Sequence, residues 1–246
     1  MIINATELKN NLGKYLRAAE REDIIITSNG RKIARLSAFH EGYSSDSENA
    51  ASVNETVPSY ALFPRKATYQ EFLELSENSE ERYEYIDGEI YLLASPKTTH
   101  QQVLGELFGI FYTWFKGKKC RPMLAPYDIT LKRSNDNTNV VQPDMMVICD
   151  LEENLNENDY YMGVPSLMVE ILSESSRGKD VVKKLDLYMS TGVKEYWIVN
   201  PFNKEINIFL FDKYDVVKNC TYKNTEKASS YVFDGLEVDL ESIFNP

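Results

Sequence analysis

Two acidic residues interrupt apolar, strand-like stretches of this chain, and they constrain its fold more than any other feature. Asp144 lies within residues 140–148 (VVQPDMMVI), and Glu170 lies within residues 167–172 (LMVEIL). A carboxylate inside such a stretch must face solvent or find a partner, because burying an unpaired charge is costly. Two carboxylates on neighbouring strands can share a hard divalent cation bound through oxygen. With Lys184 on a helix-like segment that follows, the pattern predicts metal-dependent phosphodiester chemistry.

The histidine and cysteine content narrows the kind of metal site. The 246 residues include two histidines, His40 and His100, which argues against a multi-histidine site and a Ser-His-Asp hydrolase. Carboxylate ligands would favour Mg²⁺ or Mn²⁺. The three cysteines form no CxxC pair, which argues against a disulfide framework or a zinc knuckle. With no leader-like N-terminus and no apolar run of roughly 18 residues, we expect a cytoplasmic protein without a membrane partner.

Charge and composition divide the chain into parts. Residues 1–40 carry seven basic and four acidic side chains, a net charge of +3, which leaves −14 for the remainder of the total of −11. The Ser-, Asn- and Glu-rich stretch after them lacks periodicity and is typical of a linker. We therefore predict a head at 1–39, a linker at 40–59 and a body at 60–246. The head is too small to bury a core alone, so it should dimerise or dock on the body.

The head is predicted to have the order β-α-β-β. Residues 2–3 form a short strand, Thr6 can cap an amphipathic helix, and strands at 24–27 and 32–39 flank a tight turn. The head resembles antitoxins of the Phd/YefM kind, through residues 4–12 (NATELKNNL), 24–27 (IIIT) and 29–36 (NGRKIARL).

The antitoxin resemblance implies a homodimer through the head that binds operator DNA. A helix N-terminus and the turn after the second strand offer phosphate and groove contacts. The candidate DNA-binding residues are Asn4, Thr6, Lys9, Asn10 and Arg31. The alternative is a dimerisation module with no DNA role, which the net charge of only +3 leaves open.

The body is predicted to be a mixed sheet flanked by helices, an α+β or mixed α/β fold. An Asp87-Gly88 pair between apolar runs indicates a hairpin of residues 82–86 and 89–93. Helices are expected at 68–75, about 99–115 and about 179–190, the last ended by Gly192. Further strands are expected near 119–133, 140–149, 166–173, 194–200, 205–211 and 230–238.

The body resembles the Uma family of restriction-endonuclease-like proteins, whose fold is the PD-(D/E)xK nuclease fold. The matching stretches are residues 83–90 (YEYIDGEI), 142–144 (QPD), 169–173 (VEILS) and 192–201 (GVKEYWIVNP), with His100, Lys184 and Tyr188. The resemblance spans most of residues 68–245. It implies a restriction-endonuclease-like core and a Mg²⁺- or Mn²⁺-dependent endonuclease that hydrolyses DNA phosphodiester bonds.

The resemblance also implies roles for single residues. Asp144 and Glu170 would hold the cation, with the carbonyl of Ile171 as a possible third ligand; the alternative is a pair of solvated acids on an edge strand. The nuclease signature places a lysine where Leu172 stands, and Lys184 is the natural substitute. The alternative for Lys184 is an ordinary solvent-facing helix lysine.

Two further expectations complete the prediction. Glu84 could be an additional catalytic acid that assists the metal, or simply a surface charge on the hairpin. Retention of Asp144, Glu170 and Lys184 favours an active nuclease. The leucine at position 172 favours a second function, a catalytically inactive DNA-binding regulator that keeps the nuclease fold.

Overall fold

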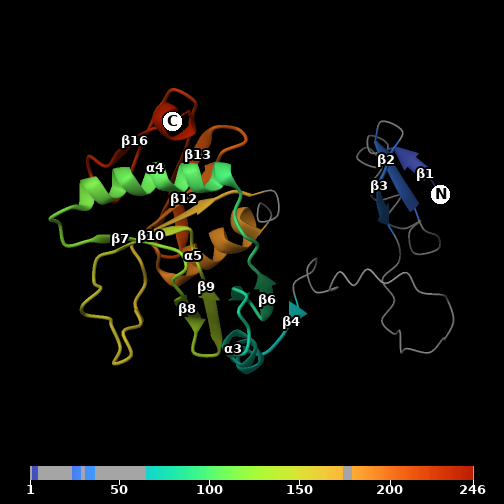
Figure 1. Cartoon of the computed structure of the whole chain (residues 1–246), viewed down its shortest axis with the longest axis horizontal. Coiled ribbons are helices and arrows are strands. Elements are labelled where there is room, and N and C mark those ends of the chain that lie inside the picture. Colours follow the sequence, from blue (N-terminus) through green and yellow to red (C-terminus); the bar gives the residue numbers. More distant parts are fainter. Residues whose placement is uncertain (1, 5–23, 29–30, 37–64, 174–178, 246) are drawn as a thin grey trace. The chain divides into compact units, whose positions relative to one another are not determined.

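The computed structural model describes residues 2–4, 24–28, 31–36, 65–173 and 179–245 (Figure 1). The chain divides into two compact units, Met1–Thr56 and Val57–Pro246. Each unit is described by itself.

The N-terminal unit contains a three-stranded sheet. Its strands are β1 (Ile2–Asn4), β2 (Ile24–Ser28) and β3 (Arg31–Leu36), in the order β1-β2-β3. β1 runs parallel to β2, and β2 and β3 form an antiparallel hairpin. The three predicted strands are confirmed, while the predicted helix between β1 and β2 lies outside the described residues.

The larger unit is built on two sheets. The six-stranded sheet has the order β14-β13-β12-β11-β10-β7, in which β11 and β12 are parallel and all other neighbours are antiparallel. Its strands are β7 (Arg121–Leu124), β10 (Met145–Ile148), β11 (Leu167–Ile171), β12 (Glu195–Asn200), β13 (Glu205–Asp212) and β14 (Asp215–Lys223).

The second, five-stranded sheet has the order β4-β6-β5-β9-β8. Its strands are β4 (Arg65–Lys66), β5 (Tyr83–Ile86), β6 (Glu89–Leu92), β8 (Ile129–Ser134) and β9 (Asn137–Val141). A two-stranded sheet joins β15 (Lys227–Ser229) to β16 (Glu237–Asp239). The helical segments are α3 (Tyr69–Glu77), α4 (Thr98–Phe115), the π-helical η2 (Lys179–Lys184), α5 (Leu185–Thr191) and α6 (Leu240–Phe244).

Side-chain alternation along the six-stranded sheet creates two apolar cores. Val169 and Ile171 of β11 pack on one face with α4 and α6, while Met168 packs on the other face with α5 and residues of β5 and β8. Successive residues of a strand point to opposite faces. Glu170 therefore projects toward the second core, to which α5 contributes.

The predicted mixed sheet flanked by helices is confirmed, with corrections at prolines and at the strand predicted near 230–238, where residues 230–236 instead connect β15 to β16. The predicted strand at 119–133 is two strands, β7 and β8, which are separated by residues 125–128 with Pro126 among them and belong to different sheets. The predicted strand at 140–149 ends at Val141 and resumes at Met145, because Pro143 lacks the N–H that a ladder requires. Asp144 therefore lies between two strands and not in the middle of one.

A buried carboxylate on β12 serves the fold. Glu195 is fully buried, and its two oxygens accept hydrogen bonds from the Trp197 indole, the Ser230 hydroxyl and the backbone N–H groups of Tyr231 and Val232. Burial raises the pKa of this carboxyl, and the hydrogen bonds oppose that effect. Glu195 thereby fastens the loop after β15 to the start of β12.

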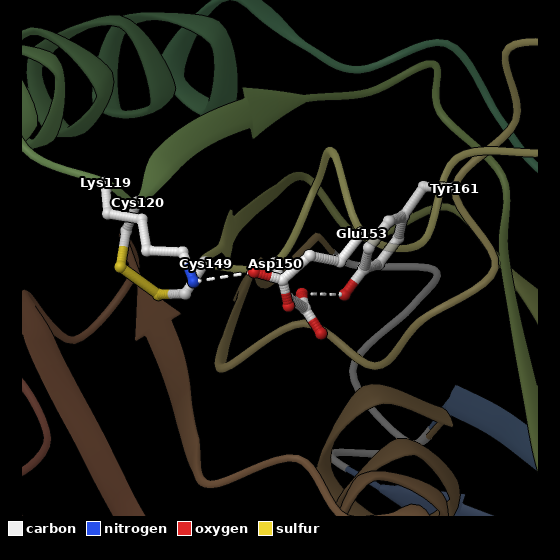
Figure 2. The surroundings of a disulfide bond; sticks show 6 residues. All are labelled: Lys119, Cys120, Cys149, Asp150, Glu153 and Tyr161. Carbon is white, nitrogen blue, oxygen red and sulfur yellow. Dashed lines mark hydrogen bonds and ion pairs between the residues drawn. A yellow bond between two sulfur atoms is a disulfide. The ribbon is translucent and has the colours of Figure 1, made fainter.

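The structure contains a disulfide that the sequence did not indicate. Cys120 and Cys149 are bonded, 29 positions apart in the chain (Figure 2). The antiparallel register of β7 and β10 pairs Arg121 with Ile148, so the two cysteines lie opposite each other just beyond that pair. The absence of a CxxC pair argued against a disulfide framework and did not indicate this single bond, because the proximity of the two cysteines comes from strand pairing and not from a local motif.

Candidate active site

Glu170 lies at the centre of the larger sheet. It belongs to β11, which is paired on both sides, and only 4% of the residue is exposed. A solvated edge-strand acid, the alternative interpretation of the sequence, is wrong for this residue. A buried carboxylate needs partners, since its desolvation would otherwise exclude the charged form.

Asp144 comes to the same place from the neighbouring strand. The β10–β11 register pairs Met145 with Val169, so Asp144, the residue before β10, lies beside the part of β11 that carries Glu170. Asp144 Oδ2 accepts a hydrogen bond of 2.7 Å from the Ile171 N–H and lies 3.2 Å from His100 Nε2. Its side chain is 22% exposed, so solvent reaches it.

Lys184 enters the site from the helical segment after β11. Its Nζ atom lies 2.6 Å from Glu170 Oε1 and 2.8 Å from Glu84 Oε1, and its side chain is 2% exposed. An ordinary solvent-facing lysine, the alternative interpretation, is therefore wrong. Leu172, at the position where the nuclease signature has lysine, is buried in the core with α5.

Glu84 is a buried member of this cluster. It is fully enclosed on β5, and besides Lys184 it accepts a 3.0 Å hydrogen bond from the backbone N–H of Gln142. The alternative of a hairpin surface charge is wrong. Glu84 shares its face of β5 with Ile86, which packs in the core against α5. The five-stranded sheet thus supplies one carboxylate to a site otherwise built on the six-stranded sheet.

Sequence reasoning missed the part that Tyr188 and His100 play in this cluster. The Tyr188 hydroxyl donates a 2.7 Å hydrogen bond to Glu170 Oε1 from a fully buried position, whereas the family resemblance named Tyr188 without a role. Its spacing of four from Lys184, which places both on one helix face, was the available signal. His100 lies in the first turn of α4 and contacts Asp144, and it too had been named without a role.

The donor chemistry of the cluster fits a hard divalent cation. The three carboxylates of Glu84, Asp144 and Glu170 and the one ammonium of Lys184 leave a net formal charge of −2. Mg²⁺ is commonly bound by one or two carboxylates and completes its shell with water. Within the described ranges, no three His, Cys, Asp or Glu side chains are grouped as ready-made metal ligands. Asp144 and Glu170 therefore suit a two-carboxylate site.

The candidate DNA-binding residues of the head are only partly described. Asn4 ends β1 and Arg31 begins β3. Thr6, Lys9 and Asn10 lie outside the described residues.

The lysine beside Lys184 makes a separate contact. Lys183 donates to the Glu89 carboxylate and the Tyr91 hydroxyl on β6. The hydrogen bond from Lys183, followed by that from Tyr91, holds the pKa of the Glu89 carboxyl below its usual value, while burial opposes the shift. The segment that carries Lys184 is thereby attached to the β5–β6 hairpin.

The depressed pKa of Glu89 predicts a pH-dependent contribution to stability. Because the folded-state pKa is lowered, the stabilisation is present above the unfolded pKa of about 4.3 and is lost as pH falls through the folded pKa. We expect Glu89→Gln to lower the free energy of unfolding at neutral pH by about 1 kcal/mol or less, since the pair is partly exposed. Thermal unfolding of both proteins across the acidic range measures this, and an unchanging difference at every pH would contradict it.

A mixed sheet with this strand order, flanked by helices, is the restriction-endonuclease-like nuclease fold. The chain belongs to the Uma2 family, described as "Putative restriction endonuclease", whose model matches residues 69–241. Residues 1–41 match the model of the Phd_YefM antitoxins of type II toxin-antitoxin systems.

The chain is also similar to a solved structure and to curated proteins. A crystal structure described as "a putative nuclease belonging to DUF820", from Anabaena variabilis, matches with a TM-score of 0.59 and 20% identity, covering 72% of this chain and 97% of that one. This likeness shows the fold. Two uncharacterized proteins of Synechocystis sp. are also similar: slr1290, 28% identical over 61% of this chain and 76% of its own, and sll1609, 24% identical over 55% and 75% respectively.

Proposed function

We propose that this protein is a Mg²⁺-dependent (or Mn²⁺-dependent) DNA endonuclease that hydrolyses phosphodiester bonds. Its family and fold are those of restriction-endonuclease-like nucleases, and divalent cations are the usual cofactors of such nucleases. The observation that carries the proposal is the position of Lys184 Nζ, 2.6 Å from Glu170. A helix residue thus provides the cationic group that the strand, with Leu172, does not.

Each residue of the cluster has a distinct part in the proposed reaction. Asp144 and Glu170 would hold the cation, which when bound polarises the phosphate and lowers the pKa of a coordinated water. Lys184 offsets negative charge that develops on the phosphate or on the attacking oxygen. Tyr188 fixes the orientation of Glu170, and His100 does the same for Asp144.

Glu84 has a supporting part in this mechanism. Its carboxylate is 2.8 Å from Lys184 Nζ and is itself held by the Gln142 N–H. The lysine is therefore fixed between two carboxylates that come from different sheets. The surrounding apolar side chains exclude water, which strengthens the electrostatic interactions among these groups.

Calorimetry tests the metal site directly. We expect Mn²⁺ or Mg²⁺ to bind the wild-type protein, and Asp144→Ala to weaken binding at least tenfold, because one of two carboxylate ligands is lost. Glu106→Ala, an exposed acid on α4, is the matched control and should bind as wild type does. Equal affinity in the wild type and Asp144→Ala would remove Asp144 from the metal site.

A catalytically inactive DNA-binding regulator is the second candidate. It is favoured by Leu172, which departs from the nuclease signature, and by the match of residues 1–41 to an antitoxin family. A plasmid-cleavage assay distinguishes these two candidate functions. DNA cleavage that requires a divalent cation and stops in EDTA supports the nuclease, whereas DNA binding with no cleavage in Mg²⁺ or Mn²⁺ supports the regulator.

We also propose that residues 1–39 form a homodimer that binds DNA, that residues 40–59 link them to the body, and that the protein acts in the cytoplasm. The net charge of +3 on the head contrasts with −14 on the rest, so the head is better suited to contact phosphates. The proposed contacts are Asn4, Thr6, Lys9, Asn10 and Arg31. No helix in the described part of the chain has the length and apolar character needed to cross a bilayer.

Salt dependence tests the role of the head. If it contacts DNA phosphates, affinity should fall steeply as salt rises, because each contact releases a counterion. We expect Lys9→Ala combined with Arg31→Ala to flatten the logarithmic salt slope by about one unit per lost contact. Fluorescence anisotropy at several salt concentrations measures the slope. Deletion of residues 1–39 without loss of DNA affinity or of dimerisation in sedimentation would contradict both proposed roles.

A further inference from the structure

The proposed reaction depends on holding Lys184 and Glu84 together, although they come from different parts of the fold. Glu84 lies on β5, three residues before the Asp87-Gly88 turn, and Lys184 immediately precedes α5. Lys184 Nζ lies 2.8 Å from Glu84 Oε1. A separate connection between the β5–β6 turn and α5 would fix this geometry from outside the buried cluster.

Arg133 makes that connection. It lies on β8, on the same face as Ile129 and Leu131, which pack in the core against α5. Its Nη1 atom lies 2.7 Å from Asp186 Oδ2 and donates a 2.6 Å hydrogen bond to Ser190 Oγ, both on α5. The Arg133 side chain is 18% exposed, so most of this arginine is enclosed.

The other side of the same guanidinium binds the hairpin turn. Arg133 Nη2 donates a 3.2 Å hydrogen bond to Asp87 Oδ2, and Nε lies 3.2 Å from Asp87 Oδ1. The backbone N–H of Asp87 donates to Asn139 Oδ1 at 2.8 Å. Asp87 has a φ of +49°, which aspartate tolerates better than most residues, so its carboxylate is presented by a defined turn.

We propose that Arg133 is a positioning residue that holds Lys184 against Glu84 and Glu170. One planar guanidinium joins the turn three residues after Glu84 to a residue two positions after Lys184. Only a fork of fixed geometry engages both partners, so a lysine does not replace it. The catalytic consequence of this inference rests on the proposed nuclease function, whereas the positioning of Lys184 by Arg133 does not.

Chemical labelling of Lys184 tests the positioning without any need for activity. An amine-reactive reagent followed by peptide mass spectrometry should find Lys184 protected in the wild type, because its side chain is 2% exposed. In Arg133→Ala we expect Lys184 to be labelled about tenfold faster, since the segment opens locally more often. Arg133→Lys should behave similarly. Lys132→Ala, an exposed neighbour on the same strand, is the control and should match wild type.

Hydrogen exchange separates local opening from general destabilisation. In Arg133→Ala, exchange should accelerate in α5 and stay unchanged in β12, which lies at the centre of the sheet. Unchanged labelling of Lys184, or labelling that rises together with exchange in β12, would overturn the proposal. Asp87→Asn, which tolerates the same turn conformation, should reproduce the local effect, and wild-type protection of Lys184 in that variant would count against it equally.

Cleavage kinetics distinguish this inference from the proposed function. We expect Arg133→Ala to lower kcat about tenfold with little change in KM, because substrate binding is not its role. Rapid labelling of Lys184 with unchanged kcat would overturn the catalytic part of the proposal. Absence of cleavage by the wild type would refute the proposed function, while the labelling result would still decide whether Arg133 positions Lys184.

Discussion

Replacing Lys184 by methionine should destabilise the larger unit by about 3–5 kcal/mol. Methionine fills a similar volume but removes the ammonium that contacts both Glu84 and Glu170. Two buried carboxylates would then lose the cation that they share, and removing one partner of a buried ion pair is far more costly than removing the whole set. Equilibrium denaturation in urea measures the loss.

Two variants provide the controls for this result. Lys183→Met, the adjacent lysine with a partly exposed ion pair, should cost about 1 kcal/mol or less. Adding Glu84→Gln and Glu170→Gln to Lys184→Met should restore most of the lost stability, because no unpaired charge remains. If Lys183→Met is as damaging as Lys184→Met, or the triple variant is no more stable than Lys184→Met alone, the electrostatic explanation fails.

Glu170→Gln should lower the rate of DNA cleavage about a hundredfold to a thousandfold. The amide keeps the volume of the side chain and an oxygen for the Tyr188 hydroxyl, but it removes the charge that would bind the cation. Single-turnover cleavage in Mg²⁺, with the melting temperature measured in parallel, gives the comparison. Glu106→Gln on the exposed side of α4 should cleave normally.

The interpretation of the Glu170→Gln result depends on cleavage and folding together. A folded variant with wild-type activity would exclude Glu170 from the proposed mechanism. Full activity of the wild type in EDTA would exclude the metal-dependent mechanism itself.

Asp144 and Glu170 could be predicted as site residues because a charge is unusual within an apolar stretch of sequence. When such a residue is buried, the folded protein must supply it with partners. Their proximity follows from the antiparallel pairing of β10 with β11, which the sequence does not reveal. The strand break at Pro143 was readable in principle, since proline is rarely found within a paired strand.

Other features could not be predicted, for identifiable physical reasons. Tyr188 looks like an ordinary core aromatic because most of its surface is indeed apolar, and only its hydroxyl meets Glu170. The strand β14 was missed because it is an edge strand with mostly exposed residues, so it lacks an apolar pattern. Arg133 gives no sequence signal, since its partners on α5 and at the hairpin turn are distant in the chain.

The oxidation state of the cross-strand cysteine pair reports the redox environment of the protein. Strand pairing keeps Cys120 and Cys149 adjacent whether or not they are bonded, so their oxidation state depends on the redox poise of the compartment. Their chain neighbours, Lys119 and Asp150, contact Glu153 and Tyr161 (Figure 2), which ties the segment after β10 to the same corner. Alkylating thiols in intact cells before extraction would therefore report the environment directly: alkylation of both Cys120 and Cys149 marks a reducing compartment, and an intact bond between them marks an oxidising one.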